Sequence, residues 1–134
     1  MNWARFIGAV ALSGFAISLS DWLFMGILFH DKYLEYPEIW RLSRQKNESK
    51  SVAISTLLGF VTALGFTVMC WQLNLYSYAS TLRLALAIWF TAPLPLILAY
   101  GLWIKLNPAV VGSHLVGWLV RLCLAACSVS LLLG

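Results

Sequence analysis

Two charged side chains lie deep within apolar stretches of the sequence. Asp21 interrupts the first apolar stretch, and Arg121 lies in the middle of the last one. A charged and unpaired side chain is costly inside a membrane, so Asp21 must be protonated, paired or near water. Arg121 lies too deep to reach the membrane surface easily. Two interpretations are open. The residues form a buried pair that pins two helices together, or they form a polar site for a proton, an ion or an anionic headgroup.

The depths of Asp21 and Arg121 permit a direct pair. The first expected span, about 5–29, ends on the side of the membrane where the last, about 110–133, begins. Asp21 lies about nine residues from that side and Arg121 about twelve, so at 1.5 Å per residue their depths agree within roughly 5 Å. The sequence therefore predicts contact between Asp21 and Arg121.

A proline pair interrupts the third apolar stretch. Pro93 and Pro95 lack backbone N–H groups, so they free the carbonyl groups of Trp89 and Thr91. Carbonyl groups in lipid need donors, and Arg121 carries five. A broken helix beside a buried arginine is typical of transporter binding sites. Ordinary kinked helices give the same pattern.

Two histidines extend this polar region toward one membrane surface. His114 precedes Arg121 by seven residues, so the two share a helix face. His30 lies at the end of the first span, on the same side of the membrane. With Asp21, these residues predict a polar track that runs inward. The alternative is a pair of interfacial histidines without a task.

The sequence lacks the motifs of several other classes of site. Its three cysteines form no Cys-x-x-Cys pair and it has only two histidines, so we expect no metal and no cofactor. It carries no phosphate-binding loop and no nucleophile–base motif. Its basic residues form no face on a soluble domain, so we expect no nucleic-acid partner.

The elements that must position these residues are membrane helices. The 134 residues are 61% hydrophobic and 10% charged, whereas a soluble domain is about half apolar and a quarter charged. About 20 apolar residues span a bilayer, and helices satisfy their own backbone there. We predict an all-α fold: a single integral membrane domain over residues 1–134. Its four transmembrane helices are expected at about 5–29, 52–73, 84–104 and 110–133.

The loops predict an orientation. The first and third loops share one side and hold six of the nine basic residues. The positive-inside rule places these loops in the cytoplasm and both termini outside. Within the first loop, Pro37 and Glu38 are typical of a helix start, and Ile39, Trp40 and Leu42 follow among basic residues. They predict a short amphipathic interfacial helix, with a solvated loop as the alternative.

Small residues recur every fourth position on two spans. They predict close helix approach. They are Gly14 and Ser18 on the first span, and Ser55, Gly59 and Ala63 on the second. Trp and Tyr residues gather near the span ends, as is typical of the aromatic belts at membrane interfaces.

Several segments carry a family resemblance. They are Met1-Asn2-Trp3, Phe29-His30-Asp31-Lys32-Tyr33, Ile88-Trp89-Phe90-Thr91-Ala92-Pro93 and Ser113-His114-Leu115-Val116-Gly117. With them the chain resembles, over nearly its whole length, a family of bacterial four-helix membrane proteins, the domain of unknown function 1761 (DUF1761). The resemblance implies a fold and a location in the inner membrane, but no activity. The family more usually has a glycine followed by aromatic residues at the position of Asp21, so the resemblance implies that Asp21 is particular to this chain.

These observations favour a small non-catalytic protein of the inner membrane. We expect it to bind lipids or a partner, as a homo-oligomer or as an accessory subunit of a larger membrane assembly. The first alternative is a small transporter or channel that uses Asp21, Arg121 and the proline break. The second is a membrane enzyme at the cytoplasmic face that uses His30 and Asp31.

Overall fold

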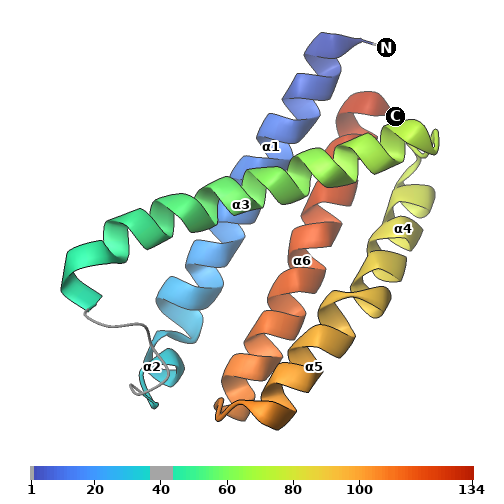
Figure 1. Ribbon diagram of the computed structural model, residues 1–134. Coiled ribbons are helices and arrows are strands. Elements are labelled where there is room, and N and C mark those ends of the chain that lie inside the picture. Colours follow the sequence, from blue (N-terminus) through green and yellow to red (C-terminus); the bar gives the residue numbers. More distant parts are fainter. Residues whose placement is uncertain (1, 37–43) are drawn as a thin grey trace.

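The described part of the chain consists of helices joined by short turns, with no strand. A computed structural model describes residues 2–36 and 44–134 (Figure 1). Its elements are α1 (Trp3–Asp21), the π-helix η1 (Trp22–Leu28), α2 (His30–Tyr33), α3 (Arg44–Gln72), α4 (Tyr78–Thr91), α5 (Pro93–Trp103) and α6 (Pro108–Leu133). Four helical stretches are long and apolar enough to cross a membrane: Trp3–Leu28, Ser49–Gln72, Tyr78–Trp103 and Pro108–Leu133. The predicted all-α class with four membrane helices is confirmed.

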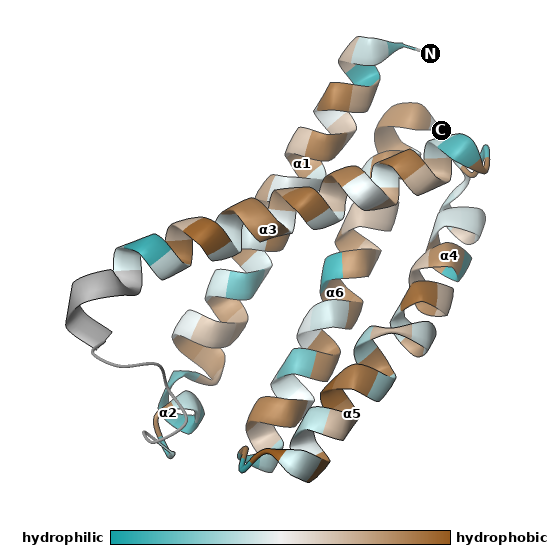
Figure 2. Ribbon diagram, in the orientation of Figure 1, coloured by the Kyte–Doolittle hydropathy of each residue, from teal (hydrophilic) through white to brown (hydrophobic). Residues whose placement is uncertain are grey.

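The outer surface of the helices is apolar. Leu57 on α3 is 62% exposed, and Leu102 on α5 is 83% exposed. Figure 2 shows apolar residues along the helices, while hydrophilic residues gather at α2 and at the turn between α3 and α4. Such a surface suits contact with lipid rather than water.

Polar caps decide where the helices begin. The Oδ1 atom of Asn2 accepts hydrogen bonds from the backbone N–H groups of the first turn of α1, and Asn107 caps α6 in the same way. Ser77 accepts a hydrogen bond from the backbone N–H of Ser80. Because Ser77 supplies this cap, α4 begins at Tyr78, earlier than the sequence-based start at about 84.

Two of the four membrane stretches are not regular α-helices. The third breaks at Ala92, whose backbone has φ −128° and ψ −68°, and Pro93 then begins α5. This is the break predicted from the prolines. The first stretch changes to a π-helix directly after Asp21. The sequence predicts a membrane helix there without indicating a π-helical segment, so this feature is new.

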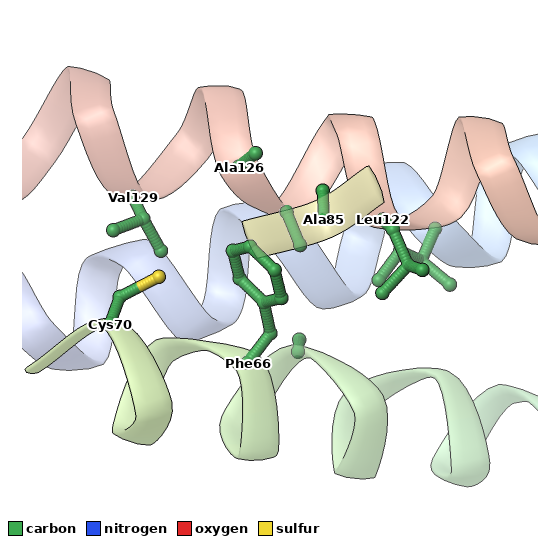
Figure 3. Close-up of a cluster of buried hydrophobic side chains, with 9 residues drawn as sticks. Phe66, Cys70, Ala85, Leu122, Ala126 and Val129 are labelled. Atoms are coloured by element: carbon green, nitrogen blue, oxygen red, sulfur yellow. The ribbon is translucent and has the colours of Figure 1, made fainter. Parts of the chain in front are cut away.

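The last helix, α6, is the centre of the bundle. Its contact with α1 is the most extensive one between two described helices, and α4 and α5 also pack on it. Figure 1 shows α6 between α1 and the α4–α5 pair, with α3 crossing over them. Figure 3 shows part of the core, where Phe66 and Cys70 of α3 meet Ala126 and Val129 of α6. Both termini lie at the same end of the bundle (Figure 1).

The small residues lie where α1 crosses α3. A Cβ atom at Gly14 would be 2.3 Å from the Phe60 ring, and one at Gly59 would be 3.1 Å from Ile17. Gly14 and Gly59 therefore permit the close approach that their spacing predicts. Ser55, in contrast, is exposed.

The interfacial helix predicted in the first loop lies mainly outside the described residues. It is expected to start at Pro37, whereas the described chain resumes at Arg44, in α3.

We expect Gly14→Ala to weaken the packing of α1 on α3. The added methyl group collides with the Phe60 ring, and such overpacking costs about 1–3 kcal/mol. Unfolding in detergent micelles measures the change. Gly65→Ala is the matched control, because a Cβ atom there meets nothing within 4 Å. Equal stability of the two variants would contradict the close packing of Gly14 on Phe60.

Candidate functional site

Asp21 and Arg121 form an ion pair. The Nη2 atom of Arg121 donates a hydrogen bond to Oδ2 of Asp21 at 2.6 Å. Asp21 is the last residue of α1, and Arg121 lies near the middle of α6. The contact predicted from the depth count is therefore present. It is short because both partners are charged.

The Arg121 side chain is held from a second direction. Its guanidinium carbon lies 4.4 Å from the ring centroid of Trp118, one turn earlier on α6. This cation–π contact favours the charged arginine in a poorly hydrated site. The side chains of Arg121 and Asp21 remain 17% and 21% exposed. The pair is thus largely, but not completely, enclosed.

Two buried polar atoms belong to residues of this region. The Nε atom of Arg121 and the hydroxyl oxygen of Ser20, the residue before Asp21, have no hydrogen-bond partner among the described residues. An unsatisfied buried polar group is costly. These groups could donate to a water molecule or to a small ligand beside the ion pair.

The backbone next to Asp21 is unusual. From Trp22 to Leu28 it forms a π-helix, and the N–H of Phe29 donates to the carbonyl of Phe24 at 3.0 Å, five residues back. The rings of Phe24 and Phe29 stack with centroids 6.1 Å apart. Short π-helical segments are frequent at functional sites. The periodicity of the apolar residues gave no signal for this segment.

A second polar cluster joins α2 to the first turns of α6. The hydroxyl of Tyr33 lies 3.1 Å from Oγ of Ser113 and 3.0 Å from Nε2 of His114. The rings of Tyr33 and His114 also meet edge to face, with centroids 5.5 Å apart. Tyr33 is only 7% exposed. Burial, and to a lesser extent the Asp21 carboxylate, raises the pKa of Tyr33.

Sequence reasoning missed Tyr33. It lies in the same short segment as His30, but nothing in the spacing indicates that Tyr33, rather than His30, contacts α6. His30 is exposed at the start of α2. The predicted track of four residues is therefore divided: Asp21 contacts Arg121, His114 contacts Tyr33, and His30 joins neither contact within the described chain.

His114 and Arg121 share one face of α6, as predicted. They are separated by two helical turns, or about 10 Å. Gly117 lies between them, and a Cβ atom there would meet nothing within 4 Å. The two polar clusters are thus stacked along α6, with room beside Gly117.

The proline break is not joined to Arg121. The hydrogen bond that Arg121 makes among the described residues goes to Asp21, so the expected donation to the carbonyls of Trp89 and Thr91 is wrong. The physical reason is that Arg121 faces α1. The hydroxyl of Thr91 instead donates to the Ala87 carbonyl of its own helix, at 2.9 Å. Pro93 is buried.

The segment after α2 is tied to the turn between α5 and α6. The amide of Asn107 donates a hydrogen bond to the carboxylate of Glu35. The ammonium of Lys105 lies 4.7 Å from the ring centroid of Tyr36. Both contacts link the chain around α2 to the start of α6, beside the Tyr33 cluster.

No group of three metal-binding side chains occurs among residues 2–36 and 49–134, whose side chains the structure describes. The cysteines of this part are free: Cys70 is buried, Cys123 is half-buried and Cys127 is exposed.

We expect Asp21→Asn to destabilise the protein by about 3 kcal/mol, because it leaves a largely buried arginine without its counter-charge. Arg121→Gln should cost a similar amount. The double variant should recover part of the loss, since it removes both charges. Unfolding of the four proteins in the same detergent gives the coupling between the two residues. Additive losses would show that the pair is not coupled.

We expect Tyr33→Phe to cost about 1–2 kcal/mol, because it removes a buried hydroxyl from Ser113 and His114. Unfolding in detergent measures the loss. Tyr78→Phe is the control, since Tyr78 is 51% exposed.

Tyr33 should also lose its proton above the ordinary pKa of tyrosine, because burial raises its pKa. The neutral phenol therefore contributes its full stability at every pH below the ordinary tyrosine pKa, and this contribution is lost as the pH rises through the raised value. Ultraviolet absorbance of tyrosinate measures the titration. Loss of a titration step above the ordinary tyrosine pKa in Tyr33→Phe would identify it, and an unchanged titration would contradict the assignment.

No curated protein sequence and no solved structure matches the chain. A family model described as protein of unknown function (DUF1761) matches residues 8–130, which is nearly all of the chain. This match includes most or all of each of the four membrane helices and both polar clusters, and the chain belongs to the DUF1761 family of proteins of unknown function.

Proposed function

We propose that this protein is a small non-catalytic, multi-pass protein of the bacterial inner membrane that serves as an accessory subunit of a membrane assembly. The observation that carries the proposal is that its buried charged and titratable side chains are bound to one another. Asp21 and Arg121 neutralise each other, and His114 is engaged by Tyr33. The groups best suited to catalysis are used to hold helices together.

The exposed surface supports the same proposal. Large apolar side chains cover the outer faces of α1, α3 and α5, for example Phe15, Leu57 and Leu102. The ion pair remains about one fifth exposed at membrane depth. A polar strip facing lipid is unfavourable, so a neighbouring helix, from a second copy or another subunit, would stabilise the protein. The excess of basic residues in the first and third loops favours cytoplasmic loops and outward termini.

Photocross-linking tests this proposal. A photoreactive residue is placed at Phe15, on α1, and in a second variant at Phe90, on α4; both side chains are more than 60% exposed. An accessory subunit should give one discrete protein adduct, reproducibly from one face, identified by mass spectrometry. The same adduct should weaken when Asp21 is replaced by Asn. Lipid adducts alone at both positions, with a monomeric mass in nanodiscs, would contradict the proposal.

A second candidate function is the transport of protons or another small ion. It is favoured by the π-helix that begins directly after Asp21 and by the unpartnered donors of Ser20 and Arg121. Proton flux into proteoliposomes tests it. Asp21→Asn should abolish a flux that Asp31→Asn retains, because Asp31 is exposed on α2, outside the spans. A flux that is insensitive to Asp21 would exclude this site.

An enzyme at the cytoplasmic face has weaker support. It would need His30, Asp31 and His114 around one cleft. His30 and Asp31 are exposed on α2, whereas His114 is half-buried against Tyr33.

A further inference from the structure

A polar cavity lies at the opposite end of the molecule from α2. It has a volume of about 370 Å³ and is lined by Asn2, Arg5, Trp71, Asn74, Tyr76 and Leu133. It is thus formed where the start of α1, the turn after α3 and the end of α6 meet, at the end of the bundle that carries both termini (Figure 1). The cavity is separate from the ion pair, so a ligand bound there would be independent of the proposed function.

The lining of this cavity is positive. Arg5 is its one charged side chain, and no carboxylate side chain lines it. Arg5 is exposed and makes no ion pair among the described residues. Its guanidinium group offers five N–H donors in a planar fork, which matches the oxygen atoms of a phosphate.

Neutral groups add further donors. The Oδ1 atom of Asn2 accepts hydrogen bonds from Ala4 and Arg5, so its side-chain NH₂ group remains to donate. Asn74 contributes a second amide. The hydroxyl of Tyr76 makes only a long contact, 3.5 Å, with the Trp71 carbonyl. Hydrogen-bond donors that make no strong hydrogen bond within the described chain therefore line the cavity.

The walls of the cavity are fixed in place. Asn74 adopts a left-handed backbone conformation, with φ 53°, which asparagine tolerates better than most residues. The N–H of Leu75 donates to the Cys70 carbonyl at 2.9 Å, which closes the turn. The rings of Phe6 and Trp71 meet edge to face with centroids 6.5 Å apart, which joins α1 to α3.

The aromatic residues of the cavity indicate a position at the level of the lipid headgroups. Trp71 and Tyr76 belong to its lining, and Trp3 follows Asn2 directly. Tryptophan and tyrosine at the ends of membrane spans mark the interface, where phospholipid phosphates lie. We propose that this cavity is a binding site for a phosphate group, held by the Arg5 guanidinium and the amides of Asn2 and Asn74.

Native mass spectrometry in a non-ionic detergent tests the site with three probes: phosphatidylglycerol, diacylglycerol and inorganic phosphate. We expect one molecule of phosphatidylglycerol to be retained per chain at a concentration at which diacylglycerol, which lacks the phosphate, is not. Arg5→Gln should weaken this retention about tenfold, because it removes a charged hydrogen-bonding partner. Asn74→Gly should weaken it severalfold, since glycine keeps the left-handed backbone but removes the amide.

Arg83→Gln is the matched control. Arg83 is an exposed arginine on α4, outside the cavity lining, so its loss removes the same charge. It should leave retention unchanged. Displacement of the lipid by millimolar inorganic phosphate would identify free phosphate as the ligand of the same site, and failure to displace it would identify the lipid headgroup. Equal effects of Arg5→Gln and Arg83→Gln, or equal retention of diacylglycerol, would overturn the proposal.

Discussion

A charge inside a membrane must be neutralised, and the contact between Asp21 and Arg121 meets this constraint. The contact fixes the position of α1 along α6 and its rotation, because the Asp21 carboxylate and the Arg121 guanidinium can move little while they stay 2.6 Å apart. Trp118 lies against the same arginine and holds it from within α6. The remaining helices are arranged around this pair of helices: α3 crosses them, and α4 and α5 pack on α6.

The Tyr33 cluster, like the ion pair, joins the N-terminal part of the chain to α6. Tyr33 follows Asp21 in the chain, on the side of α2. His114 precedes Arg121 on α6 and lies on that same side, so the two contacts follow one another along the helices. The π-helix lies between the two contacts, on the side of α1 and α2. The backbone bends at Phe29, with φ −118° and ψ 12°, directly after the π-helix. The short helix α2 that follows places Tyr33, rather than His30, against Ser113 and His114.

Much of this arrangement follows from sequence properties that act over long stretches. The four membrane helices follow from apolar length, and the break at Ala92 from proline chemistry. The Asp21–Arg121 contact follows from comparing depths, which requires only the order of the spans. Close packing at Gly14 and Gly59 follows from their spacing.

Features that depend on rotation about a helix axis could not be derived in this way. Depth alone does not show that Arg121 faces α1 and turns away from the carbonyls freed by the prolines. The π-helix arises from a local change in hydrogen bonding that leaves the apolar composition unchanged, and the contact of Tyr33 depends on the bend at Phe29 that follows it.

The central position of α6 has a consequence for the order in which the fold forms. Asp21 and its partner are 100 residues apart in the chain, and synthesis proceeds from the N-terminus. The first membrane helix is therefore made before the helix that neutralises its carboxylate exists. Until α6 arrives, Asp21 must hold a proton or remain at a hydrated surface. The first membrane helix can therefore take its final position only after the last membrane helix has been made, and packing of α6 completes the bundle.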